Sequence, residues 1–262
     1  MLEKLVSDTK KYWNYAVYAT KSQLKSEVAG SHLNWLWWVL DPLLLMLVYW
    51  FIAIALKSSG LDFFPIYIFI GLTLWNFWNG VVTGSIRLLK ANKGTVSKVF
   101  LPKLTLLYIK MMVVGFKMLI SLGIVVLMML CYRVPITWNV LYTIPLMFVL
   151  ILVTFGFSTI LMHFGVLVED LYNLVSVAMR LLFYLTGIFF SIEQSNFPGI
   201  FKTILLYWNP ACFVITGFRN TLLYGRGINL YALGFWCVAG FVLSIIGIRL
   251  IYKYENSYVK VL

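Results

Sequence analysis

The chain has 262 residues, of which 62% are hydrophobic and 11% are charged, with a mean hydropathy of +0.91 and a formal net charge of +12. Soluble domains carry about 25% charged residues, so this composition excludes a soluble fold. The apolar runs are continuous over roughly 20 residues, which predicts membrane-spanning helices and not the alternating strands of a barrel. We predict an all-α polytopic membrane protein that binds no nucleic acid despite its positive charge.

Residues 1–30 precede the first long apolar run and have the pattern of an amphipathic helix. One helical face carries Trp13, Val17, Thr20, Leu24 and Val28, and the opposite face carries Lys11, Asn14, Lys21, Ser22 and Lys25. This pattern predicts a helix in the cytoplasmic interface of the membrane, with its lysines toward anionic lipid headgroups. A simple membrane anchor and a helix that also contacts a cytoplasmic partner both fit the spacing.

Six apolar segments are long enough to be predicted as spans. They cover residues 33–56, 63–86, 104–131, 140–166, 171–190 and 230–252. Lys and Arg are concentrated before the first segment, between the second and third, and after the last. Because cytoplasmic loops are enriched in these residues, both termini are predicted to be cytoplasmic.

Aromatic and amide side chains occur in the middle of two predicted spans. The second span contains Trp75, Asn76, Trp78 and Asn79, and the fifth contains Tyr184 and Phe189. Sugar rings stack on aromatic rings and amides bind hydroxyl groups, so these residues are candidates for lining a glycan path. An aromatic belt with hydrogen bonds between helices is an equally good interpretation.

Two cations, Lys117 and Arg180, lie deep in predicted spans. A charged side chain in a span is costly, which makes both of them functional candidates. A permeating phosphate or pyrophosphate could supply the counter-charge, because Arg binds phosphate through two parallel hydrogen bonds. The alternative is a structural pair with Asp41, or contact with carbonyls exposed at a kink at Pro42.

The segment before the last span is too long for a turn and too apolar for a solvated loop. It contains Phe197 and Trp208, and it is interrupted by Pro198 and by the pair Asn209 and Pro210. Two short helices that enter the membrane and return would fit this pattern, provided that protein or a water-filled cavity surrounds them. The alternative is a hairpin that lies on the membrane surface.

No catalytic pattern is present in the sequence. It contains no phosphate-binding GxxxxGK[ST] loop, and His32 and His163 lie far apart outside any HExxH motif. Glu169 and Asp170 are adjacent, so they would point in different directions on a helix. We therefore expect no catalytic residues, no metal site and no cofactor in this chain, and an enzymatic function is not predicted.

The order of several short motifs resembles the ABC-2-type permeases of polysaccharide and polyol-phosphate exporters, a family that exports O-antigen, capsule and teichoic acid. The motifs are Asn34-Trp35-Leu-Trp37-Trp38 followed by Asp41-Pro42, then Gly71-Leu-Thr-Leu-Trp75-Asn76-Phe77, Lys98-Val-Phe100-Leu-Pro102, Glu169-Asp170-Leu171, Asn209-Pro210 and Arg219-Asn220. Two positions depart from the family. Glu169 stands where Arg is common, and Gly187, within Thr186-Gly187-Ile188, replaces a proline, so a straighter fifth span is expected.

This resemblance implies a homodimer that binds two copies of a cytoplasmic ATPase subunit, with ATP and Mg²⁺ held by that subunit. Residues 91–103 look like the family's coupling helix, with Lys93, Lys98, Phe100, Pro102 and Lys103 as candidate contacts to the ATPase. Residues 191–224 look like the outer gate, with Phe197, Trp208, Asn209 and Pro210 as its candidate residues. The implied substrate is a polysaccharide or teichoic-acid-type polymer linked to a polyprenyl diphosphate. The remaining alternatives are an ABC-2 permease for a small drug or lipid, a membrane transferase and an ion-coupled transporter.

Overall fold

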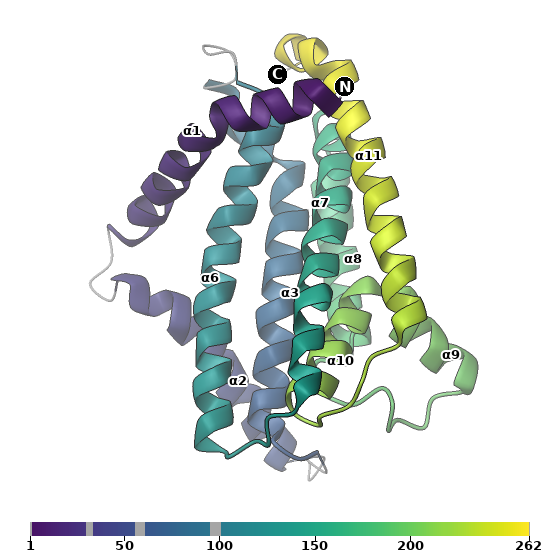
Figure 1. Ribbon diagram of the computed structural model, residues 1–262. Helices are drawn as coiled ribbons and strands as arrows, with labels where there is room; N and C mark the ends of the chain where they lie inside the picture. The colour runs from purple at the N-terminus through teal and green to yellow at the C-terminus, as the bar shows by residue number, and fades with distance from the viewer. Residues whose placement is uncertain (1, 30–33, 56–60, 95–100, 262) are drawn as a thin grey trace.

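The computed structural model describes residues 2–29, 34–55, 61–94 and 101–261, and this part of the chain contains helices and no strand. Four helices in the described residues are long and apolar enough to cross a membrane: α3 (Phe64–Ile86), α6 (Lys103–Cys131), α7 (Thr143–Leu167) and α11 (Leu230–Val261). A 3₁₀ turn (Trp138–Tyr142) extends the α7 span to Trp138–Leu167, and the span in α11 is Leu230–Glu255. They pack side by side as a bundle (Figure 1). The predicted all-helical membrane fold is confirmed at this level.

Helix α3 lies at the centre of the bundle. Of its most apolar stretch, 78% is buried inside the protein, compared with 28% for α6 and 33% for α11. It contacts α6 and α7 most extensively, and α2, α8 and α10 also pack against it. A side chain on α3 therefore faces another helix in nearly every direction, and a groove can open only where a neighbouring helix is missing.

Helices α7 and α11 form the closest helix pair in the bundle, and glycines allow their approach. A Cβ atom on Gly156 of α7 would lie 2.7 Å from the Cβ of Leu243, and one on Gly240 of α11 would lie 2.9 Å from the Cγ of Leu152. Membrane helices pack through small residues because lipid provides little hydrophobic drive for their association. This contact sets the backbone spacing on one side of the bundle.

Two further apolar helices are shorter than a typical span: α2 (Trp37–Ala55), whose apolar part is Trp37–Ile52, and α8 (Leu171–Leu185). The 15 residues of α8 extend about 22 Å, less than the roughly 30 Å hydrocarbon core. The predicted fifth span, 171–190, therefore does not form one helix. The expectation of a straighter span at Gly187 is wrong, because Gly187 adopts a left-handed φ of 68° just after the helix ends.

The segment before the last helix folds into a bent pair. It contains α9 (Gly199–Thr203), a π-helical turn (Ile204–Trp208) and α10 (Pro210–Leu222), and the two arms meet at 89°. Asn209 caps α10, since its side-chain oxygen accepts hydrogen bonds from the backbone N–H groups of Ala211 and Cys212 at 3.1 and 3.3 Å. The bend thus occurs at the Asn-Pro pair that interrupts the apolar run in the sequence.

The two ends of the bundle differ in what they hold (Figure 1). Both termini lie at one end, together with α4 (Leu88–Ala91) and the junction between α7 and α8. The bent pair and the α6–α7 connection lie at the opposite end. This arrangement places the described residues on both sides of the predicted basic loop at the same end as the termini, as the six-segment prediction requires.

Helix α1 (Leu2–Val28) starts at the end that holds the termini and then descends beside α6 (Figure 1). Its N-terminal part is attached to α11 through an ion pair between Lys4 and Glu255, with 3.3 Å between nitrogen and oxygen. The Tyr252 hydroxyl also donates a hydrogen bond to the Asp8 carboxylate at 3.0 Å. A helix is therefore present where the amphipathic helix was predicted, attached to the bundle by polar contacts, and its position in the membrane interface stays a prediction.

Candidate functional site

A groove of about 450 Å³, here called the polar groove, opens between α2, α3 and α8. Its lining consists of Leu45 from α2, Leu72, Trp75, Asn76, Asn79 and Thr83 from α3, and Tyr172, Ser176, Met179, Arg180, Phe183 and Tyr184 from α8. Five of the residues proposed for the substrate path lie here: Trp75, Asn76, Asn79, Arg180 and Tyr184. Sequence spacing alone could not show that the two helices face each other.

Helical periodicity explains why these residues line one groove. On both α3 and α8 the lining positions recur every three or four residues, which places them on one helical face. The lining from Leu72 to Thr83 covers about 16 Å at 1.5 Å per residue, and that from Tyr172 to Tyr184 covers about 18 Å. The lining of the polar groove is therefore elongated along the two helices.

The chemistry of the polar groove combines amides, aromatic rings and one cation. Asn76 is exposed and Asn79 is half-buried, so both amides are accessible from the groove. Trp75 is buried, and its ring centroid lies 5.6 Å from that of Phe183 across the groove wall. Arg180 is exposed and makes no ion pair within the part of the chain that the structure describes. Such a surface can bind hydroxyl groups, stack against rings and attract an anion.

Three other proposed path residues do not line the polar groove. Trp78 is buried and packs edge-on against Phe157 at a centroid distance of 5.5 Å. Phe189 follows α8 and packs against Tyr49 of α2 at 3.9 Å, next to one end of the groove. Trp78 has the surroundings of a core residue, whereas Phe189 belongs to an aromatic cluster that adjoins the groove.

The third of these residues, Lys117, has an internal counter-charge. Its ammonium nitrogen lies 2.5 Å from a carboxylate oxygen of Glu27 near the end of α1. It also lies 5.7 Å from the centre of the Trp38 ring. Glu27 is 90 residues away in the sequence, so helical spacing could not have identified it as the partner. The charge of Lys117 is therefore already neutralised by the protein.

Three of the residues proposed for ATPase coupling, Lys93, Pro102 and Lys103, lie at the end of the bundle that holds the termini. Lys93 is exposed just after α4, and Pro102 is the N-cap of α6. Lys103 is buried, with 3% of its surface exposed, and its ammonium donates a hydrogen bond to the Leu101 carbonyl at 3.2 Å. Lys98 and Phe100 lie outside the described residues.

The four residues proposed for the outer gate belong to the bent pair or precede it. Phe197 packs against Phe190 at 6.1 Å, and the exposed Trp208 packs against Phe235 of α11 at 5.4 Å. Asn209 caps α10, where Pro210 occupies the first turn, and the Asn209 amide donates a hydrogen bond to the Thr186 hydroxyl at 3.4 Å. That last contact joins the bend of the pair to the end of α8.

Tyr224 provides a second contact just beyond α10. Its hydroxyl donates a hydrogen bond to the Asp62 carbonyl at 3.3 Å. Burial raises the pKa of this tyrosine to about 12, so the hydroxyl keeps its proton near neutral pH and remains a donor. The bent pair is therefore joined both to α8 and to the segment before α3.

A buried arginine connects the bent pair to the centre of the bundle. Arg219 of α10 is 1% exposed, and its guanidinium donates hydrogen bonds to three backbone carbonyls: Tyr67 at 3.0 Å, Gly187 at 2.8 Å and Ile188 at 3.0 Å. It also lies 3.5 Å from the centre of the Tyr67 ring. We call these contacts the Arg219 clamp. In the sequence, Arg219 looks like one of several loop cations, and only its position within a family motif distinguishes it.

Comparison with known proteins gives consistent results. The model of the ABC-2 type transporter family matches residues 16–223, which is most of the chain. An O-antigen export system permease protein RfbA from Klebsiella pneumoniae is 25% identical over 247 residues, with 94% of each chain covered. An RfbA protein from Myxococcus xanthus is 23% identical over 216 residues, covering 82% of this chain and 83% of the relative.

Proposed function

The chain belongs to the ABC-2 type transporter family, and from this premise we propose that it is the membrane-spanning subunit of an ABC exporter for a lipid-linked polysaccharide or teichoic-acid-type polymer. A separate ATPase subunit would bind and hydrolyse ATP with Mg²⁺, and this chain would provide the path. The relatives named above are O-antigen export permeases that match nearly the whole length, which supports a glycan polymer as the cargo.

The observation that carries the proposal is the polar groove. Amides beside aromatic rings suit sugar rings and their hydroxyl groups, and Arg180 suits the phosphate or diphosphate of a lipid carrier. Arg180 has no acidic partner among the described residues, so an incoming anion would meet an available charge. A small apolar drug would need neither the amides nor the arginine.

We further propose that the path is completed by a second copy of the chain. Helices α2 and α8 flank the polar groove and expose large apolar side chains, including Leu44, Val48 and Phe51 on α2 and Leu174, Val177 and Leu181 on α8. A homodimer that packs through these helices would enclose the groove between two protomers. In this arrangement α2 and α8 count as spans, which gives six.

The end of the bundle that holds both termini would face the cytoplasm and the ATPase. Residues 91–94 and 101–103 of the basic segment 91–103 lie at this end, and we propose that the segment enters a cleft of each ATPase copy. The bent pair, at the opposite end, would form the outer gate in the bacterial inner membrane. These assignments follow the family resemblance and agree with the separation of the two ends in Figure 1.

The test is reconstitution of the chain with the ATPase encoded beside its gene, in liposomes that contain a polyprenyl-diphosphate-linked glycan. We expect a stable complex whose ATP hydrolysis the glycan stimulates. Arg180→Gln should lower this stimulation by about tenfold or more, because it removes a charge-assisted contact to phosphate. Arg226→Gln, which changes an exposed cation outside the polar groove, is the matched control.

Other outcomes would point to other functions. Stimulation by a small amphipathic drug and not by the glycan would indicate an ABC-2 permease for small molecules. Failure to bind any ATPase, together with transport driven by an ion gradient, would indicate an ion-coupled transporter and overturn the proposal.

A further inference from the structure

A second groove, here called the apolar groove, lies between α1 and the bundle and takes no part in the proposed transport path. It has a volume of about 810 Å³, which is within the range of small-molecule sites. Six lining residues come from α1 and six from α6, with further residues from α2, α3 and α7. Because α1 covers one side, a molecule inside this groove would lie between α1 and the bundle.

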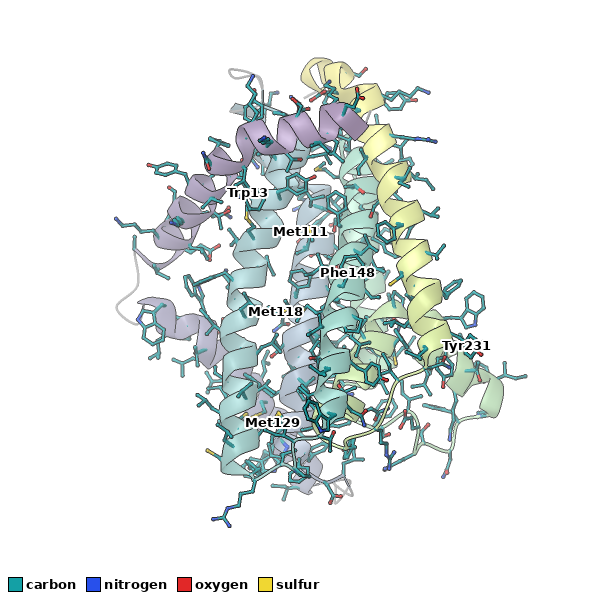
Figure 2. The ribbon with its side chains drawn as sticks, in the orientation of Figure 1. Trp13, Met111, Met118, Met129, Phe148 and Tyr231 are labelled. Atoms are coloured by element: carbon teal, nitrogen blue, oxygen red, sulfur yellow. The ribbon has the colours of Figure 1, made fainter. Side chains whose placement is uncertain are left out.

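Four methionines contribute to the wall that the bundle forms in the apolar groove. Met111, Met112 and Met118 come from α6, where Figure 2 shows two of them, and Met147 comes from α7. Methionine is unbranched and flexible, so a wall of methionines adapts to a flexible chain better than to a rigid ring system. Gly115, between them on α6, leaves room for the occupant. The wall therefore suits an acyl chain.

The rim of the apolar groove is positively charged. Lys21 and Lys25 lie one turn apart on α1, both are exposed, and neither forms an ion pair within the described ranges of the chain. Lys117 also lies near the groove, but Glu27 neutralises its charge. Two uncompensated cations beside an apolar wall are complementary to a molecule with an anionic head and an apolar chain.

The attachments of α1 explain why such a groove persists. Near its N-terminus, α1 is joined to α11 by the Lys4–Glu255 ion pair, and near its C-terminus it is joined to α6 by the Glu27–Lys117 ion pair. Between these points Ala16 packs with Ile109 and Val113 of α6, and Leu5 and Tyr12 pack against the main core. An occupant between the two attachments would fill the space that α1 itself does not fill.

We propose that the apolar groove binds an anionic phospholipid from the leaflet on the side of the termini. One acyl chain lies along the methionines, and the phosphate lies between Lys21 and Lys25. The bound lipid forms part of the packing between α1 and the bundle. A zwitterionic phospholipid with the same chains binds less well, because its own cationic group is repelled by the two lysines.

The experiment uses the full-length chain in nanodiscs that contain a trace of phosphatidylglycerol or phosphatidylcholine, each with a diazirine in the middle of one acyl chain. After illumination, mass spectrometry maps the labelled peptides. We expect phosphatidylglycerol to label α6 between Met111 and Leu119 several-fold more than phosphatidylcholine. Lys21→Gln with Lys25→Gln should reduce this labelling about 25-fold, since each lysine near an anionic headgroup contributes about fivefold in affinity.

Gly115→Leu tests the chain site, and Gly123→Leu is its control. A Cβ atom at Gly115 meets only Phe77 at an ordinary 3.6 Å, so the new side chain would grow into the apolar groove and displace the acyl chain. A Cβ atom at Gly123, on the same helix and outside the groove, meets nothing within 4 Å, so its labelling should be unchanged.

Two results would overturn the proposal. Equal labelling by the two phospholipids, unaffected by the lysine substitutions, would show that the groove holds ordinary bulk lipid. Displacement of the phosphatidylglycerol label by an equimolar polyprenyl phosphate would assign the groove to the transported lipid instead. If Gly115→Leu fails to fold, the lysine substitutions, which are on an exposed face, still decide between these outcomes.

Discussion

Replacement of Arg219 by Met tests whether the Arg219 clamp holds the bent pair against the bundle. Methionine keeps most of the length and apolar bulk but removes three hydrogen bonds from a charged donor to the carbonyls of Tyr67, Gly187 and Ile188. A buried acceptor that loses its partner costs about 1–3 kcal/mol. Part of this cost is regained, because the substitution also removes a buried charge with no acidic partner among the described residues. We expect a net loss of about 3–5 kcal/mol.

The loss should appear as a lower melting temperature of the purified protein. For a chain of this size, 1 kcal/mol corresponds to about 2–4 °C, so the expected decrease is on the order of 10 °C. Arg219→Lys should fall between Met and the native protein, because a lysine keeps the charge but cannot reach three carbonyls with a planar fork. Arg226→Gln, at an exposed position on the same side of the protein, should change the melting temperature by less than about 2 °C.

Cysteine labelling gives a second readout that is specific to the bent pair. Cys212 of α10 is fully buried, whereas Cys131 is exposed and Cys237 is half-buried. With the last two replaced by Ser, a maleimide should label Cys212 slowly in the native protein and much faster in Arg219→Met. An unchanged melting temperature together with unchanged labelling would refute the clamp.

Three further predictions concern helix contacts. Lys117→Met and Glu27→Gln should each destabilise the protein slightly. A double-mutant cycle should show a coupling free energy of about 0.5–1 kcal/mol, because both side chains are about one-third exposed. A coupling of zero would mean that the ion pair does not form. Glu255→Gln should increase hydrogen exchange in the first turns of α1, while exchange in α6 should stay unchanged. Gly156→Leu should lower the yield of folded protein, because the new leucine side chain would collide with α11. Gly123→Leu should be tolerated. Equal yields of the two variants would contradict the close packing of α7 on α11.

The helical pattern of the chain was predictable because the relevant signals are local. The amphipathic spacing of residues 1–30 is sufficient to predict α1, and long apolar runs are sufficient to predict α3, α6, α7 and α11. The Asn209-Pro210 pair also marks the bend locally, since Asn caps a helix and Pro begins one. In each case the sequence within about 25 residues determines the element.

The contacts between distant segments could not be predicted in this way. Glu27 meets Lys117 only because α1 descends along α6, and Arg219 reaches the Gly187 carbonyl only because α8 ends early. The end of α8 itself was missed because Thr186-Gly187-Ile188 is apolar enough to continue a span. A glycine at a left-handed φ ends the helix there, and hydropathy does not detect backbone conformation.

Lys117, Arg219 and Arg180 have different roles once their surroundings are known. Glu27 neutralises Lys117, and backbone carbonyls with an aromatic ring solvate Arg219, so both are satisfied by the protein itself. Arg180 has neither kind of partner among the described residues, and it faces a groove lined by amides and aromatic rings. A cation at membrane depth is costly unless something offsets its charge. Since the described residues supply no such group at Arg180, an anion that passes through the polar groove is the best remaining candidate. The transport proposal therefore depends on Arg180 and not on Lys117.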